Sequence, residues 1–231
     1  MELQASIAKA NRYSSSEQGD KAELIERPKG GISIILAEGK VGGKRSTPVT
    51  MKSVHKLMSI IADGVHDGAA SRAVLTGLQH EYQGKASLSL NLISCDLESN
   101  TIVITKNNRL PVIMMRDEEI EFLSYDQESE SLEMDPSVYQ FPIEIGMTFI
   151  LFSDGIFSAG SQLNQQIDLR TILEDYLEEE DPTVSELAEF LLTQAVSSDT
   201  GRPRDDMSVV VMRIAREKAN KYRKINIQVP L

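Results

Sequence analysis

The amino-acid sequence predicts an α+β fold in which antiparallel sheets pack face to face, with pairs of helices on the outside. Strand-like segments come in groups, amphipathic helices come in pairs, and the two kinds do not alternate one by one. Along the 231 residues the order is strands, two helices, strands, two helices and a last strand. A strict strand–helix–strand alternation would instead indicate a parallel sheet.

The strand-like segments are recognised by their apolar and β-branched residues and by the turn residues that separate them. The alternation is cleanest in SLSLNLISCDL, and Asn107-Asn108 forms a turn after TIVITK. The acidic segment Tyr125–Asp135 contains few apolar residues, so an exposed loop is expected there. The predicted strands are residues 3–13, 21–27, 31–38, 87–97, 101–106, 110–115, 119–125, 146–155 and 207–214.

Four segments carry the spacing of an amphipathic helix. In the first of them the apolar residues Met51, Val54, Leu57, Met58 and Ile61 fall on one face, which is expected to cover a sheet. The predicted helices are Thr50–Ala62, Ala69–Tyr82, Asp168–Glu180 and Thr183–Val196.

Composition and charge exclude several classes of function. The 24 basic and 35 acidic residues give a formal net charge of −11, which argues against nonspecific binding of nucleic acid. No apolar run approaches the roughly 18 residues of a membrane-spanning helix, and the N-terminus lacks a signal-peptide core. The single cysteine, Cys95, cannot form an internal disulfide and is expected to be a core thiol. Together these features favour a cytoplasmic protein that does not enter membranes.

The chain reads as one domain, residues 1–215, followed by a tail, residues 216–231. The tail (REKANKYRKINIQVPL) is basic where the rest of the chain is acidic. It is expected to form a helical turn and a loose strand. Two interpretations stay open: a solvated terminus, or a segment that docks onto the acidic surface of this domain or of a partner.

Carboxylates recur at the ends of apolar strands. Asp20 opens the strand KAELIER, Glu38 closes ISIILA, Asp154 closes FILFS, and Asp205-Asp206 precede MSVVVM. Any one of these carboxylates, taken alone, is an ordinary residue of a turn or of a strand boundary. A central sheet would bring the strand ends together, and converging carboxylates would repel one another and have raised pKa values unless cations held them.

Hard divalent ions with oxygen ligands answer this requirement, so the pattern predicts two Mn²⁺ or Mg²⁺ ions. A glycine after the carboxylate, such as Gly39, lets a backbone carbonyl approach a metal as well. The histidines do not support a zinc site, because His55, His66 and His80 lie on or between the two central helices without a ligand spacing.

The order GD, EG, SDG and DDMS along these strands and helices resembles the metal-dependent protein serine/threonine phosphatases. The nearest branch is the bacterial stage II sporulation E type, which is related to protein phosphatase 2C. The resemblance covers Ile7–Ile214, and its most specific segments are FILFSDGIFSAG and RPRDDMSVVVMRI. It implies a four-layer α-β-β-α sandwich with a two-metal site at one edge of the sheets.

The resemblance also implies a role for each acidic residue. Glu38 stands where the family has an aspartate that bridges both metals, and the Gly39 carbonyl would bind the second metal. Asp154 and Asp205 would complete the first metal. Asp20 would bind nearby, often through water, and Asp206 would lie outside the ligand set.

The implied reaction uses no enzyme nucleophile. A hydroxide held between the metals attacks the phosphorus of a phosphoserine or phosphothreonine in line. Glu38, Asp154 and Asp205 are therefore the expected catalytic residues. The resemblance implies a phosphorylated protein as substrate, and in bacterial relatives it is often a STAS-domain anti-sigma-factor antagonist in a partner-switching pathway.

The segment Glu38-Gly39-Lys40-Val41-Gly42-Gly43 departs from the family pattern, which is close to DGxGxG. Glutamate is one methylene longer than aspartate at a position where metal sites tolerate displacements of about 0.5 Å. Val41 replaces a glycine, although Gly42 can take over the turn. Lys40 stands where eukaryotic relatives often have histidine. Together with Arg45 and Arg12, it is a candidate for a phosphate contact.

Three functions therefore compete at this stage. The first is a Mn²⁺- or Mg²⁺-dependent phosphoprotein phosphatase. The second is a degenerate phosphatase domain that keeps the fold and serves as a regulatory binding module, which the substitution at Glu38 favours. The third is an unrelated acidic domain whose Asp-Gly pairs are only turns.

Overall fold

The computed structural model describes residues 1–13, 15, 19–117, 119–124, 134–163, 165–216 and 223–228. Within these residues the strands form two antiparallel sheets. Sheet A contains, in spatial order, β1 (Glu2–Ala10), β11 (Met207–Ala215), β10 (Thr148–Phe152), β7 (Val112–Arg116) and β8 (Glu119–Leu123). Sheet B contains β2 (Lys21–Glu26), β3 (Gly31–Val41), β5 (Ala86–Asp96), β6 (Thr101–Lys106) and β9 (Ser137–Pro142), and β4 (Lys44–Arg45) pairs with β3.

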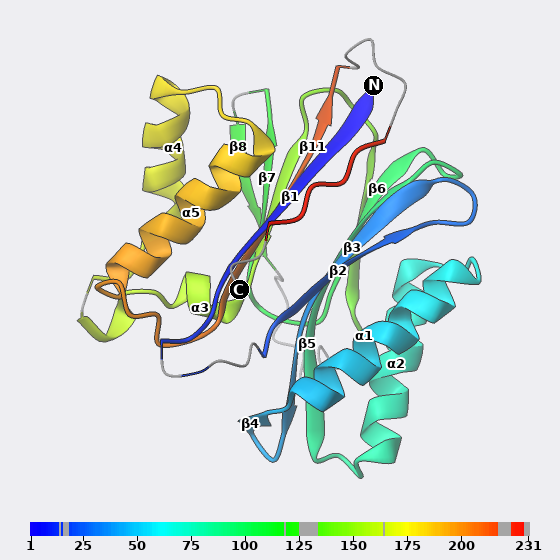
Figure 1. Cartoon of the computed structure of the whole chain (residues 1–231). Helices are drawn as coiled ribbons and strands as arrows, with labels where there is room; N and C mark the ends of the chain where they lie inside the picture. Colours follow the sequence, from blue (N-terminus) through cyan, green and yellow to red (C-terminus); the bar gives the residue numbers. More distant parts are fainter. Residues whose placement is uncertain are drawn as a thin grey trace.

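Pairs of long helices cover the outer faces of both sheets (Figure 1). Helices α1 (Thr47–Ala62) and α2 (Asp67–Glu81) pack on sheet B, and α4 (Leu169–Glu179) and α5 (Val184–Ser198) pack on sheet A. A short helix, α3 (Asp154–Phe157), follows β10, and a single 3₁₀ turn spans Ser161–Leu163. This arrangement confirms the predicted four-layer α-β-β-α sandwich.

The central strands are apolar along their whole length because both of their faces are buried. In β3, Ile34 points into the layer between the two sheets, whereas Ile35 packs against α1 and α2. In β11, Val210 lies between the sheets and Val209 packs beneath α4 and α5. The predicted core thiol, Cys95, is buried between the sheets. The molecule thus has three apolar layers, and the site residues lie at their rim.

The helix boundaries follow local capping signals. Thr183 and Glu186 form a capping box at the start of α5, and Asp168 caps α4 by accepting from the backbone N–H groups of Arg170 and Thr171. Helix α1 begins at Thr47, three residues earlier than predicted, because Pro48 suits the first turn of a helix.

Several sequence predictions need correction. Met51, expected on the buried face of α1, is 41% exposed. The strand β9 was not predicted. The strand predicted over residues 146–155 is shorter, because β10 ends at Phe152 and Asp154 already belongs to α3. Most of the predicted acidic loop, residues 125–133, lies outside the described residues.

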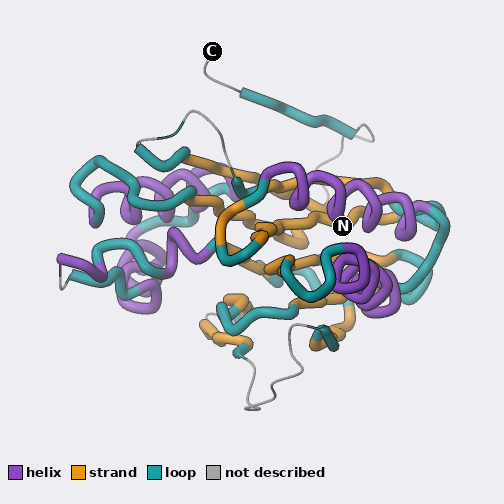
Figure 2. The backbone as a smooth tube through the Cα atoms, turned by 90° about the horizontal axis from the view of Figure 1, so that it is seen from below, coloured by secondary structure: helices purple, strands orange, loops and turns teal. Residues whose placement is uncertain are grey.

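Strand β11 ends at Ala215, the proposed end of the domain. The tail was predicted to form a helical turn and a loose strand; its residues 217–222 and 229–231 lie outside the described part of the chain, and residues 223–228 form no strand. Residues 223–228 run outside the layers of the sandwich (Figure 2), where Arg223 forms an exposed ion pair of 2.7 Å with Glu26 at the end of β2. Among the described residues no helix is long and apolar enough to cross a membrane.

Candidate functional site

The predicted acidic residues stand at strand ends that meet along one edge of the sandwich. Asp20 directly precedes β2, and Glu38 lies near the end of β3, opposite Ser89 of β5. Asp154 is the first residue of α3, two positions after the last residue of β10, and Asp205 lies two positions before β11. Strands β2 and β3 belong to sheet B, while β10 and β11 belong to sheet A. Both sheets therefore contribute to one site.

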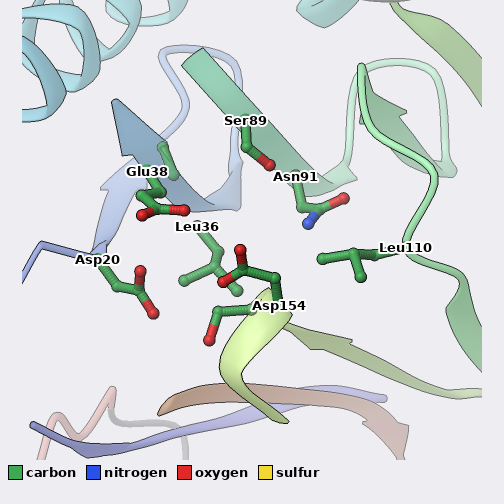
Figure 3. A pocket seen from close by; sticks show the side chains of 9 residues that line it. Asp20, Leu36, Glu38, Ser89, Asn91, Leu110 and Asp154 are labelled. Atoms are coloured by element: carbon green, nitrogen blue, oxygen red, sulfur yellow. The ribbon is translucent and has the colours of Figure 1, made fainter. Parts of the chain in front are cut away.

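A pocket opens between these strand ends, with an empty volume of about 250 Å³ that includes its mouth. Figure 3 shows the carboxylates of Asp20, Glu38 and Asp154 pointing toward one another inside it. Ser89, Asn91 and Leu110 line the pocket too, and none of these three residues was predicted to belong to the site. The Asn91 side chain is buried, and within the described part of the chain its Oδ1 has no hydrogen-bond partner.

Asp20 is the most deeply buried carboxylate of the site, with 0% exposure. Burial raises its pKa to about 6, and the nearby charges of Glu38 and Asp154 add to this rise. The Ser153 and Ser208 hydroxyls offset part of this rise in the pKa, and the Ser208 hydroxyl donates a hydrogen bond of 3.0 Å to Asp20 Oδ2. The other oxygen, Oδ1, is buried and has no hydrogen-bond partner among the residues that the structure describes. Asp20 thus presents an unsatisfied oxygen that suits a cation.

The guanidinium of Arg45 lies among the carboxylates of the site. Its nitrogens form ion pairs with Glu38 and Asp205, contact Asp206 at 3.3 Å and lie 3.9 Å from Asp154 Oδ1. Strand pairing explains this placement, because Arg45 is directly opposite Lys40 in the β3–β4 hairpin. Glu38 is two residues from Lys40, so Glu38, Lys40 and Arg45 share one face of the hairpin.

Lys40 adds a second cation to the same group. Its Nζ lies 3.3 Å from Glu38 Oε2 and 3.7 Å from Asp154 Oδ2. The hairpin turn falls on Gly42 and Gly43, whose φ angles are 57° and 76°. Two consecutive positive φ angles are typical of a two-residue hairpin, so Gly42 takes over the turn that Val41 cannot make.

Asp206 binds protein groups on both of its oxygens. Oδ2 accepts the Gly19 N–H at 2.6 Å, and Oδ1 accepts the Arg12 N–H at 2.9 Å. These bonds tie the segment before β2 to the start of β11. The expected place of Asp206 outside the ligand set stays a prediction, and Arg12 contacts Asp206 through its backbone N–H.

The two glycines that follow the acidic residues allow close backbone packing. A Cβ on Gly155 would lie 2.1 Å from the Asp206 carbonyl oxygen, and one on Gly39 would lie 2.9 Å from the Thr50 nitrogen. The Gly39 carbonyl accepts the Ser46 N–H at 2.8 Å, which closes the β3–β4 hairpin onto α1. Its predicted role as a metal ligand stays a prediction.

The donor set fits hard divalent cations, because carboxylate oxygens are the ligands that Mg²⁺ and Mn²⁺ prefer. Asp20 Oδ1 and Asp154 Oδ1 are buried oxygens to which no described residue donates a hydrogen bond. As the side chains stand in the described residues, no group of three or more Asp, Glu, His or Cys residues is placed to hold one ion. A cationic group of the protein itself, the Arg45 guanidinium, lies among these carboxylates.

Residues 34–215 match the family model described as Stage II sporulation protein E (SpoIIE). The chain belongs to the SpoIIE family. Two curated SpoIIE proteins are similar along most of this chain. The protein of Priestia megaterium is 20% identical over 211 residues, and that of Bacillus subtilis (strain 168) is 22% identical over 199 residues. These matches span 90% and 85% of the chain but only 36% and 24% of those proteins.

Solved structures share the fold of this SpoIIE-family chain. The phosphatase domain of SpoIIE from Bacillus subtilis, in a crystal form without domain swapping, superposes with a TM-score of 0.70 at 19% identity and covers 98% of both chains. The catalytic domain of the phosphatase PstP, solved with two manganese ions, has a TM-score of 0.67 at 18% identity, covering 93% of this chain and 99% of that one. The alternative of an unrelated acidic domain is therefore wrong.

Sequence reasoning underestimated three residues of this SpoIIE-family site. It treated Arg45 only as a candidate phosphate contact, whereas the structure places its guanidinium against the acidic residues. Ser153, which lines the pocket, and Ser208, which donates to Asp20, both lie inside the quoted motifs SDG and DDMS. Both serines lie close in sequence to the predicted acidic residues, and this proximity could have indicated that their hydroxyls bind within the site.

Proposed function

We propose that this domain hydrolyses phosphoserine or phosphothreonine on a protein substrate with the help of divalent cations, Mn²⁺ or Mg²⁺. The observation that carries the proposal is the gathering of Glu38, Asp154 and Asp205 around one cationic group at the meeting edge of both sheets. Membership of the SpoIIE family supports the same reaction class, as does the phosphatase fold of the solved structures.

Divalent ions, when bound, would supply an activated water near neutral pH and neutralise charge on the transferring phosphoryl group. Glu38, Asp154 and Asp205 would hold two such ions, with the Gly39 carbonyl and Asp20 as further ligands. Asp206 would position the start of β11 and the segment before β2. Lys40 is 36% exposed, so its ammonium can face a phosphate oxygen that enters from solvent.

The substrate would be a phosphorylated protein, which membership of the SpoIIE family and the phosphatase fold of the solved structures support. A STAS-domain anti-sigma-factor antagonist in a partner-switching pathway of the cytoplasm is the specific candidate. The same proposal takes residues 1–215 as the phosphatase domain and residues 216–231 as a separate basic tail.

Turnover of a phosphoserine peptide tests the proposal directly. Purified protein with Mn²⁺ should release phosphate, and a chelator should abolish the release. Asp154→Ala should lower kcat/KM at least about 100-fold, more than residues that only orient ligands typically do. Asp175→Ala, an exposed change on α4, is the matched control and should leave turnover unchanged. Metal-dependent turnover that survives Asp154→Ala would refute the proposed site.

A second function is a catalytically degenerate SpoIIE-type domain that acts as a regulatory binding module. The Arg45 ion pairs favour it, because a guanidinium already neutralises the residues that would hold metal. Glu38 favours it too, since the longer side chain displaces the bridging oxygen. Binding of Mn²⁺ without turnover, together with turnover in Glu38→Asp, would support this alternative over the enzyme.

A further inference from the structure

Arg45 occupies an unusual electrostatic position for a hairpin residue. The side chain is 22% exposed and contacts the carboxylates of Glu38, Asp154, Asp205 and Asp206, which come from both sheets. A planar guanidinium with several N–H donors suits such a group better than a point charge. Arg45 therefore holds together residues that would otherwise repel one another.

The charges at this place do not balance without more cations. Glu38, Asp154, Asp205 and Asp206 bring four negative charges when ionised, and Arg45 with Lys40 brings two positive ones. A carboxylate oxygen that pairs closely with a guanidinium is blocked for a metal ion on that side. Arg45 and a divalent cation thus make competing demands on Glu38 and Asp205.

We propose that Arg45 is a built-in counter-ion that competes with divalent cations for Glu38, Asp154 and Asp205. The inference rests on the metal site of the proposed function and adds a control to it. With Arg45 inside, the acidic residues are neutralised and the metal-free domain is stable. With metal bound, the guanidinium is displaced toward the mouth of the pocket.

The hairpin geometry permits this exchange without unfolding. Arg45 lies on the two-residue strand β4, next to a tip in which an added Cβ on Gly42 or Gly43 would meet nothing within 4 Å. The long side chain can leave the carboxylates by rotation about its own bonds. The backbone bonds of the hairpin, including Ser46 N–H to Gly39 O at 2.8 Å, stay in place.

Lys44 provides a matched control within the same strand. It pairs with Val41, whereas Arg45 pairs with Lys40, so the two side chains project from opposite faces of the hairpin. Lys44 is exposed. The variants Arg45→Gln and Lys44→Gln remove the same unit of charge from neighbouring residues, and only the first removes the guanidinium from the acidic residues.

Calorimetric titration with Mn²⁺, performed on wild type and both variants, tests the inference without an activity assay. Arg45→Gln should bind Mn²⁺ at least about tenfold more tightly than wild type, and Lys44→Gln should bind it within about twofold of wild type. Thermal unfolding in chelator gives the second measurement. Arg45→Gln should melt at a lower temperature than wild type, and saturating Mn²⁺ should remove that deficit.

The outcomes separate this inference from the proposed function. Equal or weaker Mn²⁺ binding by Arg45→Gln would overturn the competition and leave a metal-dependent phosphatase standing. Absence of Mn²⁺ binding in all three proteins would overturn the metal site and the inference together. Should Arg45→Gln fail to fold, the same titration of Arg45→Lys decides, since a shorter point charge should compete less and raise the affinity.

Discussion

Gly155 lies so close to the backbone of Asp206 that a Cβ there would be 2.1 Å from the Asp206 carbonyl oxygen. The contact joins the start of α3 to the residue before β11, and thereby sets the distance between Asp154 and Asp205. Gly155→Ala should lower the free energy of unfolding by at least about 2 kcal/mol, because backbone must move to relieve the overlap. Urea unfolding measures the effect.

Gly77→Ala is the control for this change. An added Cβ on Gly77 would lie 2.8 Å from Lys56 Nζ, the mobile end of a side chain that can turn away. Gly77 is inside α2, so alanine should raise the free energy of unfolding by about 0.5–1 kcal/mol. Equal effects of the two alanines would contradict the close backbone contact.

Asp20 should make the metal-free domain sensitive to pH. Its pKa rises from 3.8 unfolded to about 6 folded, chiefly through burial, so the folded state keeps a proton that the unfolded state has released. The free energy of unfolding should therefore fall as the pH rises from about 4 to about 6. Asp20→Asn should remove this fall and should stabilise the metal-free protein at pH 7 by about 1–3 kcal/mol.

The same substitution should weaken Mn²⁺ binding, since it removes a proposed ligand oxygen. Parallel pH series of wild type and Asp20→Asn in chelator, followed by Mn²⁺ titration of both, measure the two effects. A wild-type stability that stays level across this pH range would show that Asp20 is ionised when folded.

Lys106 is a second buried charge, with 0% exposure. Burial lowers its pKa from 10.5 to about 8, and its Nζ donates to the Leu110 carbonyl. The folded state releases this proton before the unfolded state does. The stability of wild type relative to Lys106→Met should therefore rise by up to about 3 kcal/mol between about pH 8 and pH 10.5.

At pH 7 the uncharged Lys106→Met protein should be the more stable of the two, by about 1–2 kcal/mol after loss of the bond to Leu110. Chemical unfolding of both proteins at pH 7 and pH 10 gives the comparison. A difference that does not change with pH would mean that Lys106 keeps an ordinary pKa.

Arg27 should contribute to stability far from the acidic site. It is 8% exposed, lies 2.6 Å from Asp67 and 3.4 Å from Asp96, and donates to the Ser33 hydroxyl at 3.0 Å. Arg27→Met leaves both buried carboxylates without their partner, so unfolding should become easier by about 3–5 kcal/mol. Mn²⁺ affinity should not change.

Arg116→Met provides the exposed counterpart, because the Arg116 pair with Glu144 is 3.6 Å long and nearly half exposed on both sides. Its loss should cost less than about 1 kcal/mol. A similar cost for both variants would mean that the Arg27 group is hydrated in solution.

Apolar patterning predicted most of the fold, because the central strands are continuous apolar runs and the long helices are periodic. Strands β3 and β11 are apolar on both faces, and the long helices carry one apolar stripe each. Strand β9 escaped prediction because it lies at the edge of sheet B, ends in Pro142 and exposes Val138 while Tyr139 faces inward. Met51 was wrongly predicted to be buried for a similar reason. Helical spacing tells which residues share a face of the helix, but not how far the sheet beneath that face extends.

The acidic positions of the site were predictable because strand ends determine where Glu38, Asp154 and Asp205 meet. The position of Arg45 among the carboxylates was not predictable, because Lys40, Lys44 and Arg45 carry the same charge within six residues. Only the pairing of Arg45 with Lys40 decides which of them faces the carboxylates. This pairing depends on where the hairpin turns. Because the segment of residues 38–43 departs from the family pattern, the sequence did not determine that the turn falls on Gly42 and Gly43.

The acidic residues come from the ends of β2 and β3 in one sheet and of β10 and β11 in the other. Whatever cation holds them therefore also fastens the two layers along that rim. A partner that binds the exposed tip of the β3–β4 hairpin and displaces it outward would weaken the link between the two sheets at this rim, while the three apolar layers stay intact. The hairpin thus connects the outer surface of the molecule to the acidic residues of the pocket.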